Sequence, residues 1–423
     1  MWSSQHREGK TLVVDILWIL FLILKYSLMS VEKMYAFLIG RPQHCQQMYE
    51  KSAEVCTIWF FHRRPPCLDE LFTGDFIHTH ERYDHPNIIL NDSVTLFRIT
   101  REHAIFVDCE DYDVFNSKNG PFAFPLQGVN ARKVIYLPLS SFHKISKDIT
   151  LPNVPIIHLA HHGRCGSTVV TKVFEAIPHS LSISETYAFT DIAYVSHCGT
   201  HDRDTLKSLC FSALMCTLKH ANTRKSSIIF FKCQSTVVFV LDILMEAVPE
   251  IKCVYMHRDP VPYVRSYEKL MIMNNWSLSN IKTLQCLVGI GQHSIVNGER
   301  SRSPDYLKNL SIFSKLSLTW ISKWIAYKNL CAKGYAIKSL KYEELLGEPY
   351  QVLIQIFTFM NLSKYLVPND LTHVMSNDSQ ADSIFSSRTK TNDLNGRCRS
   401  LTAELKEEVN KLCDDFNTPR FWK

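Results

Sequence analysis

A short glycine-containing stretch near the middle of the chain has the residues of an anion-binding turn. It reads AHHGRCGSTV and lies between an apolar run and a stretch with helical spacing. Gly163 and Gly166 permit a tight turn whose backbone N–H groups, with the N-terminus of the next helix, attract an anion. Arg164 adds a permanent cation, and hydroxyl donors follow at Ser167 and Thr168. We predict an anion site here; the alternative is an ordinary strand–turn–helix connection capped by the two hydroxyls.

A second pair of anion-binding residues follows a later apolar run. In KCVYMHRDPVPYVRSYEKL, Arg258 ends a predicted strand and Pro260 suits the first turn of a helix. Ser266 lies two turns along that helix, so both side chains could reach one anionic group. The alternative is a solvated arginine beside an N-capping Asp259.

The elements that would position these residues alternate along the second half of the chain. From residue 154 onward, apolar runs typical of strands alternate with helical patterns, up to the helix that carries Ser266. This alternation predicts a mainly parallel sheet flanked by helices, with ligands at the carboxyl ends of the strands. Before it, residues 29–66 have a helical pattern, and three short β-rich runs lie within residues 92–140. We predict an N-terminal apolar helix (1–40), a helical and then β-rich extension (41–150) and a main domain (151–423).

Together the two motifs resemble the sulfotransferases that use 3'-phosphoadenosine 5'-phosphosulfate (PAPS). In that family a Lys/Arg-Ser-Gly-Thr/Ser-Thr turn binds the 5'-phosphosulfate, and RCGST stands here at residues 164–168. A strand-terminal arginine and a serine eight residues later bind the 3'-phosphate, as Arg258 and Ser266 would. A late Tyr-Glu-Asp-Leu-like stretch matches YEEL at residues 342–345. The resemblance covers roughly residues 154–362 and implies an α/β three-layer sandwich with a P-loop NTPase-like core.

The resemblance also implies roles for individual residues. Catalytic roles fall to Glu185, Arg164 and Lys232, of which Lys232 would lie beside the phosphosulfate. Arg388 and Lys390, in a polar segment of the tail, could close over the nucleotide or the acceptor. The residues implied in binding the donor are Gly163, Arg164, Cys165, Gly166, Ser167, Thr168, Arg258, Ser266 and Arg388.

Two departures from the family pattern bear on catalysis. Cys165 replaces the usual loop serine, which a backbone-dominated loop should tolerate. Gln234 stands where many cytosolic relatives carry the histidine that acts as general base, and glutamine cannot take a proton. Lumenal relatives that sulfate carbohydrate or tyrosine have a glutamate in the region of Glu185 as the base, and the chain resembles this branch more closely. The alternative is that Glu185 caps a helix beginning at Thr186.

The N-terminus bears on location. Residues 11–24 are nearly all apolar, and an extension to residue 29 reaches the roughly 20 residues that span a bilayer only by including Asp15 and Lys25. Membrane association through residues 11–29 is expected, as a single-pass type II anchor in the Golgi. A signal peptide, disfavoured by the absence of a small-residue cleavage site, and a buried or interfacial helix of a cytoplasmic protein remain open.

Composition limits the function classes. The 423 residues are 46% hydrophobic and carry a net charge of +6, which suits an ordered protein with an anionic ligand or a membrane surface and disfavours a general nucleic-acid binder. The 14 cysteines form no CxxC pair and no HExxH occurs, so no metal site is predicted; a few disulfides remain open. A glycoprotein is weakly indicated by five sequons, at Asn91, Asn275, Asn309, Asn361 and Asn377.

We therefore expect a sulfotransferase that moves a sulfuryl group from PAPS to a hydroxyl or amine of a carbohydrate, a protein tyrosine or a small molecule. The sequence does not identify the acceptor or the oligomeric state, although residues 271–311 are expected to shape the acceptor site. Two alternatives remain. A nucleotide kinase or NTPase on a related core is disfavoured by the missing Walker lysine. A membrane-tethered protein that keeps the fold without catalysis is left open by Gln234 and Cys165.

Overall fold

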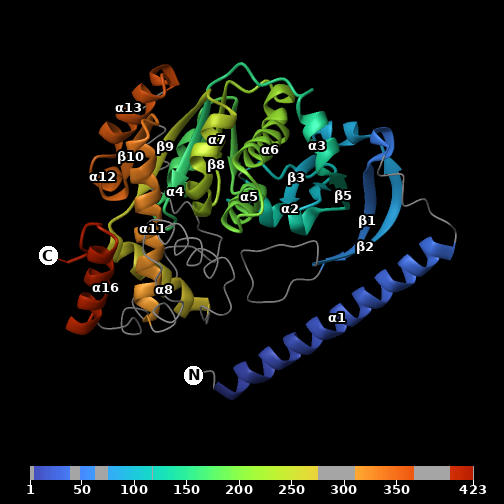
Figure 1. Ribbon diagram of the computed structural model, residues 1–423, viewed down its shortest axis with the longest axis horizontal. Coiled ribbons are helices and arrows are strands. Elements are labelled where there is room, and N and C mark those ends of the chain that lie inside the picture. Colours follow the sequence, from blue (N-terminus) through green and yellow to red (C-terminus); the bar gives the residue numbers. More distant parts are fainter. Residues whose placement is uncertain are drawn as a thin grey trace. The chain divides into compact units, whose positions relative to one another are not determined.

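The chain divides into two compact units. The computed structural model describes residues 4–38, 48–61, 75–116, 118–274, 310–365 and 401–422. One unit comprises Met1–Val114 and Phe124–Ile149, and the other comprises Phe115–Ala123 and Thr150–Lys423. We call them the N-terminal unit and the core unit, and Figure 1 shows their elements.

The N-terminal unit is built on a five-stranded antiparallel sheet with the order β2-β1-β5-β4-β3. Helix α2 (Ala123–Asn130), helix α3 (Leu139–Ser146) and two short 3-10 turns, η2 (Tyr49–Lys51) and η4 (Pro86–Leu90), accompany it. The strands are β1 (Ala53–Phe61), β2 (Phe76–Asp84), β3 (Val94–Ile99), β4 (His103–Asp108) and β5 (Lys133–Pro138). The last three confirm the β-rich runs predicted within residues 92–140.

Strand β1 corrects the helix expected between residues 29 and 66. Ala53–Phe61 reads AEVCTIWFF, and its β-branched and aromatic side chains suit a pleated strand better than a helix. Its backbone pairs with β2 on one side and with β5 on the other. The helix predicted from the spacing of apolar residues is therefore wrong for Ala53–Phe61, where β propensity and pairing with two strands favour a strand.

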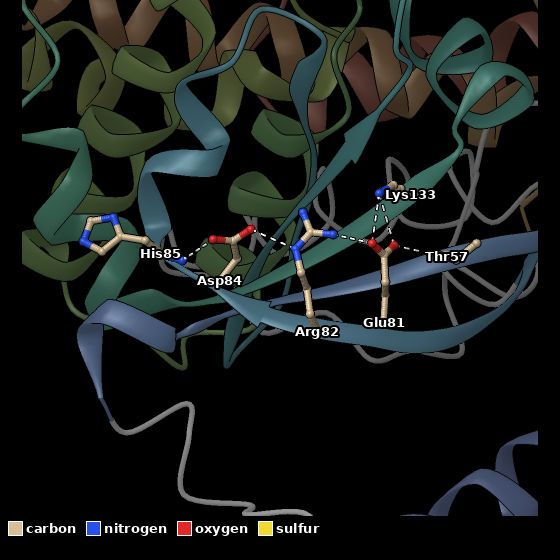
Figure 2. Close-up of polar contacts among 6 residues, drawn as sticks. All are labelled: Thr57, Glu81, Arg82, Asp84, His85 and Lys133. Carbon is tan, nitrogen blue, oxygen red and sulfur yellow. Dashed lines mark hydrogen bonds and ion pairs between the residues drawn. The ribbon is translucent and has the colours of Figure 1, made fainter.

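Charged side chains cross-link the partly exposed part of this sheet (Figure 2). Thr57 Oγ1 on β1 donates to Glu81 Oε2 on β2 at 2.8 Å, and Lys133 Nζ on β5 lies 3.1 Å from the same carboxylate. Glu81 reaches both because it is the extra residue of a β-bulge between the Val55 and Cys56 pairings. Arg82 continues the array from Glu81 to Asp84, whose other oxygen accepts from the backbone N–H of His85.

Helix α1 (Ser4–Leu38) is continuous over 35 residues, as the N-terminal helix prediction requires. One stripe faces the sheet of its own unit: Phe21 and Lys25 are buried, and Glu32 Oε1 accepts from the backbone N–H of His80 at 2.6 Å. Among the α1 side chains whose burial the structure describes, the exposed large apolar ones are Leu17, Ile19, Leu20, Ile23, Leu24, Tyr26, Leu28, Val31, Met34, Tyr35, Phe37 and Leu38. Among the described residues, no helix has an apolar stretch long enough to cross a membrane.

The core unit confirms the predicted α/β class. Its five-stranded sheet has the order β10-β9-β6-β8-β7, and every neighbouring pair is parallel. The strands are β6 (Ile156–His161), β7 (Ser180–Ser184), β8 (Ile228–Lys232), β9 (Ile251–His257) and β10 (Ile337–Lys341). Strands β6 and β8 are buried along their whole length, as expected of a parallel sheet covered on both faces.

Helices cover both faces of this sheet and make three layers (Figure 1). On one face the strands share an apolar cluster with α4 (Ser167–Glu175), α12 (Tyr342–Gly347) and α13 (Pro349–Phe359). On the other, Phe231 contacts Phe189 of α5 (Ala188–His197), and Tyr255 stacks on Tyr327 of α11 (Ile312–Ala332) at 4.2 Å. The other elements are α6 (Arg203–Thr223), η5 (Ser235–Val240), α7 (Leu241–Ala247), α8 (Pro260–Asn274), η7 (Ser363–Tyr365) and α16 (Ala403–Asp415).

Candidate functional site

The predicted site residues gather at one edge of the core sheet. The strands are parallel, so their carboxyl ends meet there. The glycine turn follows β6, Glu185 follows β7, Lys232 ends β8, and Arg258 follows β9. Residues 342–345 begin directly after β10. One edge therefore receives every described motif that the sequence singled out.

The turn after β6 has the backbone conformation of an anion cradle. Gly163, Arg164 and Gly166 have positive φ angles of 82°, 50° and 80°, and no side chain caps the following helix α4 at its N-cap, Gly166. Consecutive residues in such conformations turn backbone N–H groups toward one point, which the helix dipole reinforces. Because the N-cap residue is glycine, it has no side chain that could cap the helix, and the anion site stays a prediction beside the alternative of an ordinary strand–turn–helix connection.

Neighbouring side chains leave no room for a Cβ at Gly163 or Gly166, so close packing requires glycine there in addition to the positive φ angles. A Cβ on Gly163 would lie 2.6 Å from Tyr267 Oη, and one on Gly166 would lie 2.4 Å from the ring of Tyr342. Aromatic side chains from α8 and α12 therefore lie directly against the turn.

The Cys165 side chain points away from the cradle. It is fully buried within the apolar cluster, and its thiol lies 3.6 Å from the backbone oxygen of Met256. Burial raises the pKa of the thiol to about 11, so it stays protonated and unreactive near neutral pH. Among the predicted ligands, Cys165 can serve an anion through its backbone N–H and not through its side chain.

Glu185 and Lys232 form an ion pair. The carboxylate Oε1 lies 3.0 Å from Lys232 Nζ, with the lysine side chain fully buried and the glutamate side chain 18% exposed. The backbone N–H of Glu185 donates to the Lys232 carbonyl at 2.6 Å, and Glu185 has a positive φ of 56°. Helix α5 has Tyr187 as its N-cap residue, so the alternative role of Glu185 as a helix cap is wrong.

Lys232 also links this pair to the glycine turn. Its ammonium is 3.5 Å from Thr168 Oγ1 in the first turn of α4 and 4.9 Å from the centre of the Phe122 ring. A buried cation, a partly exposed carboxylate and an anion cradle thus lie together. This arrangement can hold an anionic donor beside a proton acceptor.

Arg164 contacts both Ser266 and Arg258. Arg164 Nε donates to Ser266 Oγ at 2.9 Å, and Arg258 Nη1 donates to the Arg164 carbonyl at 3.2 Å. The Arg258 guanidinium also lies over the Tyr342 ring, 4.7 Å from its centre. Burial and the neighbouring Arg258 lower the pKa of Arg164, and Tyr267 partly offsets this; an arginine nevertheless remains charged. Two cations and a hydroxyl therefore lie together, in an arrangement that can hold an anion.

Glu343 and α11 fix the Arg258 end of this group. Glu343 lies 3.8 Å from Arg258 Nε, and its oxygens accept from the backbone N–H of Asp259. Asp259 in turn pairs with Lys341 at 2.9 Å, and Trp320 Nε1 donates to the Arg258 carbonyl. The alternative of a freely solvated arginine at position 258 is therefore wrong.

Three residues that contact the site were not predicted from the sequence: Tyr267, Lys323 and Glu343. Glu343 lies within the YEEL stretch, but the motif did not show which residue it would hold. Lys323 is hidden in α11, where buried residues occur around most of the helix and leave no readable face. Tyr267 follows Ser266 directly, and nothing in the sequence marks its approach to Gly163.

Several predicted residues stand apart from this arrangement. Arg388 and Lys390 lie outside the described residues, as do residues 275–309 of the expected acceptor segment. Gln234 lies close by, where its Oε1 accepts from Thr190 Oγ1 at 3.2 Å. In the described parts of the chain, no cluster of His, Cys, Asp and Glu side chains is suited to a metal ion.

No protein-family model matches the sequence, and the curated proteins give no match. The sulfotransferase domain from the curacin biosynthetic pathway is 14% identical over 64% of this chain and 99% of that domain, with a TM-score of 0.36. Mouse sulfotransferase SULT7A1 complexed with PAP is 11% identical over 66% of this chain and 88% of that one, with a TM-score of 0.37. The sulfotransferase from Alicyclobacillus acidocaldarius is 15% identical over 63% of this chain and 98% of that one, with a TM-score of 0.34. All three of these solved structures are named as sulfotransferases.

Proposed function

We propose that the protein is a PAPS-dependent sulfotransferase that transfers a sulfuryl group to a hydroxyl or amine of an acceptor. One observation carries the proposal: the glycine turn, the Glu185–Lys232 pair and the Arg164–Ser266–Arg258 group meet at one edge of the sheet. These residues fit a donor with two separate anionic ends. The turn suits the 5'-phosphosulfate, and Arg258 with Ser266 suits the 3'-phosphate.

The side chains also suit the chemistry of transfer. The acceptor oxygen or nitrogen forms a bond to sulfur while the bond from sulfur to the phosphate oxygen breaks, and that oxygen keeps the electron pair. Lys232 and the N–H groups of the turn stabilise the negative charge that develops on the leaving phosphate. Glu185 takes the proton that the acceptor loses, because its carboxylate is partly exposed and Gln234 cannot accept it.

We propose further that α1 holds the protein at a membrane through contact with lipid, as the sequence predicts for residues 11–29. Of the side chains that the structure describes between Leu17 and Leu38, twelve large apolar ones are exposed. Two more, Trp59 and Phe60 on β1, are 68% and 53% exposed, and the Phe60 ring lies 6.0 Å from that of the buried Phe21. Exposed apolar surface of this extent favours contact with lipid.

Ligand binding and turnover test the enzymatic proposal. PAP, the desulfated donor product, should raise the melting temperature of the full chain, whereas ATP with magnesium should not. Labelled PAPS should be consumed in the presence of an acceptor panel of hydroxyl and amine compounds. Stabilisation by ATP with magnesium and not by PAP would show a nucleotide kinase or NTPase instead. Binding of PAP without turnover would show a protein that has kept the donor site and lost catalysis.

A further inference from the structure

A buried lysine contacts the residue that precedes the glycine turn. Lys323 is on α11 and is 0% exposed. Its ammonium donates to the backbone carbonyl of His162 at 2.7 Å and to Ser235 Oγ at 2.9 Å. Within the described part of the chain no carboxylate pairs with it. A buried ammonium without a counterion is costly, so Lys323 is a candidate for a role beyond packing.

The two acceptors of Lys323 belong to different strand ends. His162 directly precedes the glycine turn after β6, and Ser235 begins the η5 turn that follows β8. Lys323 therefore ties the turn that cradles the anion to the segment that continues from Lys232. Ser235 Oγ would lie 3.3 Å from a Cβ on Gly163, so the three groups are closely packed.

His161 makes a second tie between the same two segments. Its Nδ1 accepts from the backbone N–H of Gly163 at 3.0 Å, so Nε2 carries the proton that bonds the Cys233 carbonyl at 2.8 Å. This assignment requires a neutral imidazole. Burial, together with the nearby Lys232, holds the pKa of His161 well below its usual value, in agreement with that form. The turn is thus fastened to the end of β8 at two consecutive residues.

We propose that Lys323 is a positioning residue for the donor: it fixes the glycine turn against the end of β8, and its charge favours binding of the anionic donor. The inference rests on the proposed PAPS site. It extends that site to a residue that contacts the turn from inside the protein. His161 links the glycine turn to the end of β8 through a neutral side chain, and Lys323 links the same segments through a charged one.

The titratable side chains that face Lys323 are all neutral near pH 7. The titratable side chains that face it are His161, His162, Cys165 and Tyr263, and its own backbone carbonyl accepts from Tyr255 Oη. Burial lowers the pKa of both histidines and raises the pKa of Cys165 and of both tyrosines, so all are neutral near pH 7. Burial also lowers the pKa of Lys323 to about 7.

Donor binding should consequently be linked to protonation of Lys323. An anion on the turn favours the ammonium form, and by linkage the ammonium form binds the anion more tightly. If binding raises the pKa of Lys323 by one unit, the affinity is about tenfold higher with the lysine charged than with it neutral. PAP affinity should therefore fall as the pH rises above 7.

The test measures PAP binding by calorimetry between pH 6.5 and 8.5 in the full chain and in Lys323→Met, Lys323→Arg and Lys252→Met. Methionine replaces the buried charge with an apolar chain of similar length, so the melting temperature without ligand should not fall greatly. Lys323→Met should bind PAP about tenfold more weakly at pH 6.5 and lose the pH dependence. Lys323→Arg keeps a permanent charge and should retain more of the affinity. Lys252→Met is the matched control, because Lys252 also donates to a backbone carbonyl, that of Met360, away from the turn.

The outcomes separate the two proposals. If the wild type binds PAP and Lys323→Met matches it in affinity and pH profile, the role of Lys323 is overturned while the proposed function stands. If the wild type binds no PAP at any pH, the proposed function fails and the role of Lys323 fails with it. An equal loss in Lys252→Met would show a general effect of losing a lysine that donates to a backbone carbonyl, and would also overturn the inference.

Discussion

Glu185 has a backbone conformation that is unusual for a residue other than glycine. Its φ of 56° lies in the left-handed region, which costs a non-glycine residue roughly 1–3 kcal/mol. Two contacts with Lys232 hold it there, one through its backbone N–H and one through its carboxylate. Strain of this kind persists where the surroundings enforce it, and it directs the carboxylate to the edge of the sheet where the donor would lie.

We predict that Glu185→Gln lowers the turnover of PAPS by about 10²- to 10⁴-fold, the usual contribution of a positioned general base. Glutamine keeps the shape but cannot take a proton, so PAP affinity should change far less than kcat. Glu250→Gln, at an exposed position before β9, is the control and should leave both unchanged. A rate equal to that of the wild type in Glu185→Gln would exclude this residue as the base.

Arg258 and Ser266, the residues proposed to bind the 3'-phosphate, lead to a prediction for affinity rather than rate. Removing the charge in Arg258→Met should weaken PAP binding about 10- to 100-fold, because hydrogen bonds to charged groups contribute roughly 1.5–3 kcal/mol. Ser266→Ala should weaken it less. Adenosine 5'-monophosphate lacks the 3'-phosphate, so its binding should change little in either variant.

Arg82→Met controls for the loss of an arginine, since Arg82 belongs to the charged array of the N-terminal unit (Figure 2). Equal losses for PAP and adenosine 5'-monophosphate in Arg258→Met would mean that Arg258 acts by holding the Arg164 carbonyl and not by binding the 3'-phosphate.

At the scale of elements, the glycine turn can be tested by filling its space. Gly166→Ala places a Cβ 2.4 Å from the Tyr342 ring at a φ of 80°. Gly334 has a similar φ of 84°, and a Cβ there meets nothing within 4 Å. Gly334→Ala should cost about 1–2 kcal/mol of backbone strain, whereas Gly166→Ala adds a clash and should also weaken PAP binding. Equal melting temperatures and equal PAP affinities in the two variants would show that the approach of Tyr342 to the turn is unimportant.

Some features of the core unit can be predicted from the sequence, whereas others can be seen only in the folded structure. Short runs bounded by turns predicted β6, β7, β8 and β9, because buried parallel strands leave that pattern. Strand β10, which reads IKSLK, lies beyond the alternation read from the sequence. Parallel order then placed the residues after each strand at one edge. The contacts of Arg164 with Ser266 and of Glu185 with Lys232 needed the fold, because they join segments 102 and 47 residues apart.

Helix α11 shows why part of the site could not be predicted. Trp320 and Lys323 lie three residues apart on it and hold the Arg258 carbonyl and the His162 carbonyl respectively. Tyr263 Oη of α8 also contacts Thr319 Oγ1 on the same helix. These contacts are to backbone atoms or to side chains distant in sequence, so no motif records them. Helix α11 is nevertheless the element that joins the ends of β6, β8 and β9.

Helix α1 carries the prediction on membrane binding. The full chain should float with vesicles of phosphatidylcholine and phosphatidylserine, and Leu20→Glu with Ile23→Glu should abolish this. Each buried charge costs about 2.5–3.5 kcal/mol within a bilayer. Val129→Glu with Leu346→Glu introduces the same charges at apolar positions that are 65% and 58% exposed elsewhere, and it should still float. Flotation of the Leu20/Ile23 variant would place lipid contact outside α1.

For the whole molecule, the two units have different parts in the proposed function. Every described residue of the candidate site belongs to the core unit, whereas α1 and the exposed Trp59 and Phe60 belong to the N-terminal unit. The proposed donor chemistry and the proposed membrane contact thus lie in separately packed parts of one chain. A chain of two units can unfold in two steps, and the step that PAP shifts would identify the core unit.

Buried histidines make the stability of the core unit sensitive to acid. His158 is 0% exposed, its ring stacks on Phe231 at 4.5 Å, and burial lowers its pKa to about 4. The unfolded chain has a histidine pKa near 6.5, so between pH 6.5 and 4 the unfolded state binds a proton that the folded state does not. The free energy of unfolding should therefore fall as the pH drops through this window, by about 3 kcal/mol for His158.

Thermal unfolding between pH 7.5 and 4.5 checks this dependence. His158→Gln removes the titrating group, so the melting temperature of the core unit should fall less steeply with acid than in the wild type. His179→Asn is the control: His179 is exposed with a φ of 59°, a conformation that asparagine accepts, and its loss should leave the pH slope unchanged. A wild-type slope in His158→Gln would assign the acid sensitivity to the other buried histidines, His161, His162 and His220, whose pKa values burial also lowers.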